Sequence, residues 1–229
     1  MLHGWGFTPR IWDPLRAWLG DFRLLTPDLN NGVATLAARA DAVSGAIDPD
    51  AVLVGWSLGA MLAIELARRH PAKVRALCLI GTTQRFVANT EWPHGLDGGV
   101  VSAFRRDFAE NPARTIRRFM ALQTLGDARR LPLQRQLESA LADPKSAGLA
   151  EGLAILEAAD LRDTVLPETL PMLLIHGIHD ALMPVDAART LASSHASAQL
   201  HEIPDAGHCP LFTDPERLAG LIRSFTLEC

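Results

Sequence analysis

Cysteine is scarce in this sequence, and its spacing excludes two classes of protein. The three cysteines, Cys78, Cys209 and Cys229, form neither a metal-binding pattern nor a disulfide framework. The N-terminus lacks the charged segment and the apolar core that mark a signal peptide. Together these absences predict a protein of the reducing cytoplasm without a cysteine-based metal site. We also expect no other metal and no cofactor.

Long apolar runs and an excess of positive charge are also missing. No run reaches the roughly 18 residues of a membrane-spanning helix, although 48% of the residues are hydrophobic. The formal net charge of -4 gives no indication of nucleic-acid binding. We therefore expect no nucleic-acid or membrane partner. Without repeats or low-complexity segments, the 229 residues predict one large domain, or one domain with a small insertion.

What the sequence does contain is an alternation of strand and helix patterns near both ends. Such alternation predicts an α/β fold with a mostly parallel sheet and helices on both faces. The expected strands are 22–26, 51–54, 74–80, 172–177 and 198–203, and the expected helices are 10–19, 33–47, 60–69, 185–194 and 215–225.

The pattern changes between residues 82 and 166, where no convincing strand is found. Four helical patterns replace it, and a helical block inserted into an α/β chain is typical of a cap. We therefore expect an α/β core formed by residues 1–81 and 167–229, covered by a four-helix cap formed by residues 82–166. The expected cap helices are 100–110, 112–125, 131–141 and 146–159.

The most informative stretch is Gly55-Trp56-Ser57-Leu58-Gly59, which lies between an expected strand and an expected helix. In that context Gly-x-Ser-x-Gly indicates a nucleophile elbow, a strained turn that exposes a serine hydroxyl. The two glycines are needed because a Cβ would crowd the close approach of strand and helix. An ordinary glycine-rich turn is the alternative, and Ser57 is the candidate nucleophile.

A serine nucleophile needs a base, and the base needs an orienting acid. In the elbow architecture these follow in the order Ser, Asp or Glu, His. Asp180 follows the next-to-last expected strand, and His208 follows the last one. Both lie where open α/β sheets place their sites, at the carboxyl ends of parallel strands. The sequence therefore predicts a Ser57–His208–Asp180 triad.

Other assignments for the acid and its neighbours remain open. Asp180 could be a turn residue or a helix cap, and Asp186 and Asp205 are competing acids. We expect Asp186 to lie in the following helix, and Asp205 is too close in sequence to the candidate base. His176 and His179 flank the acid, but this spacing without a carboxylate partner is a weak indication of metal.

The oxyanion formed during acyl transfer needs two N–H donors. One is expected from Leu58, directly after the nucleophile, and the other from the loop His3-Gly4-Trp5-Gly6. We choose Trp5 as the second donor. Its side chain is expected either to line the pocket or simply to pack in the core.

These motifs resemble those of the α/β-hydrolase superfamily. Within it, the chain is similar to the pimeloyl-[acyl-carrier protein] methyl ester esterases of biotin biosynthesis. The closer resemblance rests on the elbow, on Glu91-Trp92-Pro93 and on the cap segment 114–126. It implies a serine carboxylesterase that works as a monomer and converts the methyl ester of pimeloyl-[acyl-carrier protein] to pimeloyl-[acyl-carrier protein] and methanol.

The resemblance also implies roles for particular residues. Arg114 and Arg118 would face the acyl carrier protein. Between residues 98 and 135, eight arginines stand against three acidic residues, and such a patch can attract an acidic partner. A solvated helix face would have the same composition. The implied acyl-site residues are Trp5, Ser57, Leu58, Phe119, Met120, Ala121, Leu122, Gln123 and His208.

The N-terminus departs from the family pattern, because only Met1-Leu2 precedes the His-Gly motif. We expect the N-terminal strands to be missing or truncated, which would expose an edge of the sheet. Either a shorter sheet is tolerated or the natural chain starts further upstream. Two other functions also remain: a general short-chain carboxylesterase or a hydrolase of other acyl or C–C bonds, and a non-catalytic binding protein on a hydrolase scaffold.

Overall fold

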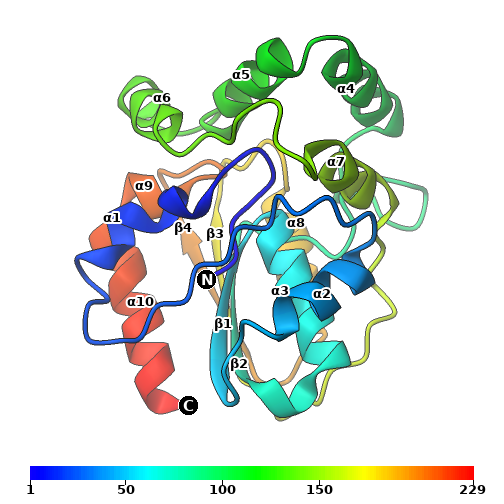
Figure 1. Cartoon of the computed structure of the whole chain (residues 1–229). Helices are drawn as coiled ribbons and strands as arrows, with labels where there is room; N and C mark the ends of the chain where they lie inside the picture. The colour runs from blue at the N-terminus through cyan, green and yellow to red at the C-terminus, as the bar shows by residue number, and fades with distance from the viewer.

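The computed structural model describes residues 1–229. A parallel four-stranded sheet lies at the centre, with helices on both sides and a further helical layer above one end (Figure 1). The strand order is β1-β2-β3-β4. The strands are β1 Ala51–Trp56, β2 Val74–Ile80, β3 Met172–Gly177 and β4 Ala198–Ile203. The predicted α/β fold is confirmed.

The inner strands β2 and β3 are almost entirely apolar and buried, as expected for parallel strands covered on both faces. Helices α2 and α3 lie on one side of the sheet and α1 and α10 on the other (Figure 1). The helices of the core are α1 Asp13–Arg16, α2 Leu36–Ser44, α3 Leu58–Arg69, α8 Val185–Ser193, α9 Pro210–Thr213 and α10 Pro215–Glu228, with 3-10 turns at Pro9–Trp12 and Pro71–Lys73. No helix combines the length and apolarity needed to cross a membrane.

The four cap helices form the layer above the carboxyl ends of the strands (Figure 1). Local capping explains where two of them, α4 and α5, begin. The Asp97 side chain accepts from Val100 N, and Asn111, followed by Pro112, both ends α4 and caps α5. The cap helices are α4 Gly98–Glu110, α5 Pro112–Gln123, α6 Arg130–Glu138 and α7 Leu149–Ala158. The domain boundaries at 82 and 166 stay a prediction.

The N-terminal region differs from the sequence prediction. The expected helix 10–19 is a 3-10 turn followed by the single turn α1, because Pro14 cannot donate the hydrogen bond that would continue it. Trp18, near the end of this stretch, is 47% exposed. Segment 22–26 is not a strand, because no neighbouring strand pairs with it. The helix predicted at 33–47 is shorter, since Thr35 caps it through Ala38 N.

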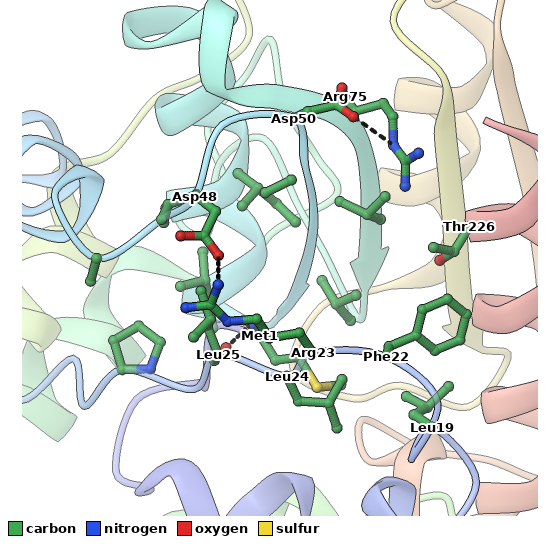
Figure 2. A pocket seen from close by; sticks show the side chains of 18 of the residues that line it. Met1, Leu19, Phe22, Arg23, Leu24, Leu25, Asp48, Asp50, Arg75 and Thr226 are labelled. Carbon is green, nitrogen blue, oxygen red and sulfur yellow. Dashed lines mark hydrogen bonds and ion pairs between the residues drawn. The ribbon is translucent and has the colours of Figure 1, made fainter.

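The strand before the His-Gly motif is reduced to one bridge. Leu2 N donates to Val54 O at 2.8 Å, and Trp56 N donates to Leu2 O at 3.0 Å. Beside it, a cavity of about 290 Å³ borders the outer edge of β1 (Figure 2). The Met1 ammonium donates to Leu25 O there, and burial, aided by the charge of Arg16, lowers its pKa to about 5.

Candidate active site

The elbow at Ser57 has the backbone strain that its motif predicts. Ser57 lies between β1 and α3 with φ 58° and ψ −124°, a positive φ that non-glycine residues rarely adopt. A Cβ at Gly55 would overlap the backbone of Gly59, and a Cβ at Gly59 would overlap the Leu2 carbonyl. The glycines therefore allow the strand, the helix and the N-terminal segment to meet at the nucleophile.

This close approach predicts opposite effects for two glycine-to-alanine changes in helices. Alanine is favoured over glycine within a helix by about 1 kcal/mol. Gly220→Ala in α10, where nothing lies within 4 Å of the new Cβ, should raise the free energy of unfolding by about 0.5–1 kcal/mol. Gly59→Ala should lower it, because overpacking costs about 1–3 kcal/mol or more. Urea denaturation measures both, and a stabilised Gly59→Ala protein would contradict the elbow geometry.

Asp180 and His208 meet as a buried pair beyond the ends of β3 and β4. His208 Nδ1 donates to Asp180 Oδ2 at 2.6 Å. The other carboxylate oxygen accepts from Leu182 N at 2.9 Å and from Met183 N at 2.8 Å. Burial by itself raises the pKa of Asp180, but the charges and hydrogen bonds of His208 and His176 outweigh it and hold that pKa well below its usual range. The carboxylate is therefore ionised and fixed in orientation.

His208 lies beside the elbow with one ring nitrogen free. Trp56 Nε1 donates to His208 O at 2.8 Å, and the two rings are 5.5 Å apart. Because Nδ1 donates to the acid, Nε2 is left as the basic nitrogen, and it is buried without a hydrogen-bond partner. No hydrogen bond joins it to Ser57 Oγ, and such bonds are often long before substrate binds. The pair can accept a proton at Nε2.

His176 is a neighbour of the acid that the sequence reasoning weighed only as a metal ligand. Its fully buried ring places Nε2 2.7 Å from Met183 O and 3.2 Å from Asp180 Oδ2. No group of histidine, cysteine and carboxylate side chains in the chain is arranged to bind a metal ion. The sequence contained one indication of this contact: His176 lies at the end of a buried strand, four residues before Asp180. No hydrogen bond or ion pair joins His208 to Asp186 or Asp205, the rival acids.

The two predicted oxyanion donors belong to segments that adjoin the nucleophile. Leu58 is the first residue of α3, so its N–H has no partner within the helix. The loop before Trp5 passes close to Ser57, since a Cβ at Gly4 would lie 3.1 Å from the Ser57 Cβ. Their role as oxyanion donors stays a prediction.

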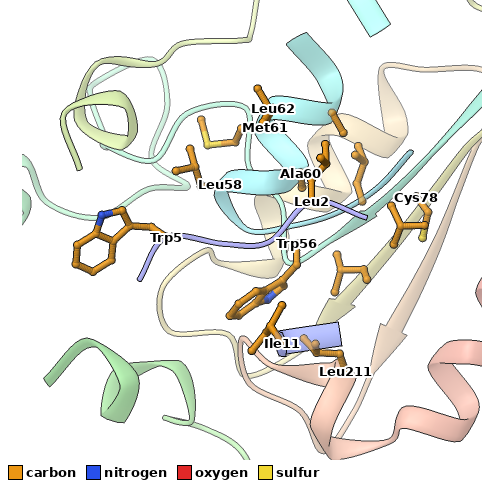
Figure 3. Close-up of a cluster of buried hydrophobic side chains, with 14 of the residues drawn as sticks. Leu2, Trp5, Ile11, Trp56, Leu58, Ala60, Met61, Leu62, Cys78 and Leu211 are labelled. Atoms are coloured by element: carbon orange, nitrogen blue, oxygen red, sulfur yellow. The ribbon is translucent and has the colours of Figure 1, made fainter. Parts of the chain in front are cut away.

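The Trp5 side chain connects the core to the cap. Its indole N–H donates to Leu149 O in α7 at 2.7 Å, and its ring packs edge-on against Phe104, Phe108 and Phe119. Figure 3 shows it directed away from Trp56, which points toward Ile11 and Leu211 in the core. Trp5 therefore forms part of the wall between the two layers.

Helix α5 brings some of the implied acyl-site residues to this wall. Phe119, Met120 and Gln123 are buried, and Ala121 and Leu122 are half-buried. The Gln123 amide nitrogen is buried without a partner, and its oxygen lies 3.8 Å from Cys209 Sγ, directly after the candidate base. Arg114 and Arg118 are exposed on the outer face of the same helix, where Arg118 pairs with Asp107 at 3.0 Å. One face of α5 thus borders the site and the other faces solvent.

A buried histidine–aspartate pair beside a strained serine elbow defines the class of the protein. A sequence profile of the alpha/beta hydrolase family matches residues 1–221. The chain belongs to the alpha/beta hydrolase family.

Within this family, two similar relatives have the same name. The chain is 44% identical to the pimeloyl-[acyl-carrier protein] methyl ester esterase of Aromatoleum aromaticum, over 97% of this chain and 95% of that one. It is 35% identical to the esterase of the same name from Yersinia enterocolitica, over 100% and 92% of the two chains.

Solved structures agree on the fold. The enol-lactonase from Burkholderia xenovorans superposes with a TM-score of 0.84 at 20% identity, covering 99% of this chain and 89% of that one. A thermophilic esterase from Thermogutta terrifontis superposes with a TM-score of 0.81 at 24% identity, covering 99% and 88%. At these identities the likeness concerns the fold alone.

Proposed function

We propose that this chain is a serine carboxylesterase of biotin biosynthesis that hydrolyses the methyl ester of pimeloyl-[acyl-carrier protein]. The chemistry rests on the 2.6 Å hydrogen bond between His208 and Asp180 beside the Ser57 elbow. The substrate rests on the 44% identity, over nearly the full length, to an enzyme of that name. A cytoplasmic monomer remains a prediction.

The first half of the reaction forms an acyl-enzyme. Ser57 Oγ attacks the ester carbonyl carbon while His208 Nε2 takes the serine proton. Asp180 keeps His208 in the tautomer that can accept it and stabilises the imidazolium. The backbone N–H groups of Leu58 and Trp5 donate to the oxyanion, each lowering the barrier by about 3 kcal/mol. The tetrahedral intermediate then collapses, and His208 returns the proton to methanol as it leaves.

The second half releases the product by the same groups in reverse. Water enters the place that methanol left, and His208 takes one of its protons as the oxygen attacks the acyl carbon. Collapse breaks the bond to Ser57 Oγ, which recovers a proton from His208. The freed carboxylate leaves with the acyl chain still attached to its carrier. Every proton transfer uses His208, so this route requires no cofactor.

The outer face of the cap supports the proposal of an acidic carrier protein as partner. Arg114, Arg117 and Arg118 are exposed on α5. The segment from residue 98 to residue 135 has five more positive than negative charges, although the whole chain is negative. Such a patch raises the rate of encounter with an oppositely charged protein.

Removing two of these charges separates carrier recognition from ester chemistry. The Arg114→Ala/Arg118→Ala protein should lose about 10-fold in kcat/KM for the carrier-linked ester at low salt, because patch charges act mainly on association. Hydrolysis of a small free ester should stay unchanged. The control is Arg16→Ala/Arg223→Ala, which removes the same charge from α1 and α10 of the core. Equal losses in both double variants would exclude a specific carrier surface.

The decisive experiment is a mass-resolved assay of the purified protein. One reaction contains the pimeloyl methyl ester on its acyl carrier protein, and a parallel one contains the free small ester. Faster loss of the methyl group from the carrier-linked ester supports the proposal. Hydrolysis of the free ester alone would indicate a general carboxylesterase. A folded protein that is inactive on both and unreactive toward a fluorophosphonate would instead be a binding protein on a hydrolase scaffold.

A further inference from the structure

The turn between α5 and α6 of the cap lies against both loops that carry the candidate acid and base. Gly126 has φ +85°, and a Cβ on it would overlap the carbonyl of His179, next to Asp180. A Cβ on Gly207, next to His208, would lie 2.6 Å from Leu125 O. Backbone therefore packs directly on backbone at both loops, without intervening side chains.

Asp127 is the only acidic residue of this turn, and it is 8% exposed. Its Oδ1 accepts from Arg129 N at 2.7 Å, which closes the turn itself. Its Oδ2 faces the core, where it accepts from Thr213 Oγ1 and, in a longer hydrogen bond of 3.4 Å, from Gly207 N. A backbone bond from Ala128 N to Asp205 O at 3.2 Å joins the same two segments.

These contacts hold both ends of the short segment that carries the base. Gly207 immediately precedes His208, and Thr213 ends the single turn of α9 that follows it. Burying a carboxylate is costly unless hydrogen bonds satisfy it. Here three donors converge on Asp127, and two of them come from outside the cap. A turn that needed only to close would leave this carboxylate in solvent, as Asp143 does when it accepts from Lys145 N at 2.9 Å.

We infer that Asp127 is a positioning residue, which fixes the orientation of His208 and couples the cap to the catalytic base. The inference rests on the proposed function in taking His208 as the base. Because Gln123, at the end of α5, lies only four residues before Asp127, an acyl chain seated against α5 contacts the same rigid unit that holds the base. Cap placement and proton transfer are then linked through one side chain.

The test uses three variants of the full chain. Asp127→Ala removes all the acceptor contacts, and Thr213→Val removes only the side-chain donor from the core and leaves the turn closed. Asp143→Ala is the matched control, because it removes the same kind of turn-closing bond without touching the catalytic loops. Each protein is checked for folding by circular dichroism and thermal unfolding.

Two readouts distinguish positioning from a general loss of structure. The first is the rate constant and final stoichiometry of Ser57 labelling by a fluorophosphonate, which needs the serine and its base but not the natural substrate. The second is kcat and KM for a small free ester. We expect Asp127→Ala to slow labelling and lower kcat by about 10- to 100-fold, with full final labelling and little change in KM, because small displacements of a catalytic group cost this much. Thr213→Val should cause a smaller loss of the same kind, and Asp143→Ala none.

Unchanged labelling and kcat in a folded Asp127→Ala protein would overturn the inference. It would also be overturned if the loss of rate matched a loss of labelled sites, since that is an unfolded fraction. If Asp127→Ala does not fold, a normal labelling rate in Thr213→Val would overturn the inference instead. A wild-type protein that labels rapidly but ignores the carrier-linked ester would count against the proposed substrate and leave these comparisons valid.

Discussion

Replacing Ser57 with alanine is expected to lower kcat by about 10⁶-fold, the effect of removing the nucleophile from a comparable triad. Alanine should leave the fold intact, since no hydrogen bond depends on the Ser57 hydroxyl and the methyl group fills the same space. Residual turnover would come from the oxyanion donors and from substrate binding. Hydrolysis of a small ester and fluorophosphonate labelling measure the change.

Ser139→Ala is the control for this experiment. Ser139 is exposed at the end of α6, and its hydroxyl donates only to Gln136 O. The Ser139→Ala protein should have the same esterase activity as the wild type. If a folded Ser57→Ala protein hydrolysed esters at a near-normal rate, the nucleophile would have to lie elsewhere, and the elbow would be an ordinary strand–helix turn.

Replacing Asp180 with asparagine is expected to lower kcat by about 10⁴-fold, because the wrong histidine tautomer is then favoured. An amide can still accept from Leu182 N and Met183 N through its oxygen, so the loop keeps its shape. Its NH₂ group would face His208 Nδ1 and donate to it. The ring proton would then reside on Nε2, which could no longer accept a proton from Ser57. Steady-state kinetics on a free ester tests this expectation.

Asp186→Asn separates Asp180 from its rival in the sequence. Asp186 lies in the first turn of α8, where its carboxylate pairs with Arg189 at 2.9 Å. Its replacement should leave kcat close to the wild-type value. A large loss for Asp186→Asn together with a small one for Asp180→Asn would reverse the assignment of the acid.

The sequence was most informative where burial is complete. Strands 74–80 and 172–177, which are almost entirely buried, were predicted with the bounds that the structure has, because apolar runs between helical patterns leave few alternatives. The prediction failed at 22–26, where an apolar run has no strand beside it to pair with. Strand formation depends on a partner, and the sequence of one segment does not contain that information.

In the candidate site too, the residues marked by a local motif were predicted, and the contacts between distant segments were not. The order of serine, acid and histidine, each at the end of a strand pattern, placed Asp180 and His208 close enough to bond. Contacts between distant segments had no comparable signal. Trp5 meets Phe104 and Phe119, and Asp127 meets Thr213, across separations that no short motif covers. The catalytic roles of Ser57, Asp180 and His208 remain predictions.

The position of Trp5 between core and cap gives the protein a built-in optical reporter. The chain has no tyrosine, so its near-ultraviolet emission comes from tryptophan. Trp5 is 3% exposed and surrounded by phenylalanine rings of the cap. Any movement that lifts the cap must wet this indole, and wetting shifts indole emission to longer wavelength. If the cap moves, the change in emission of Trp5 among the five tryptophans can be followed in the unlabelled protein.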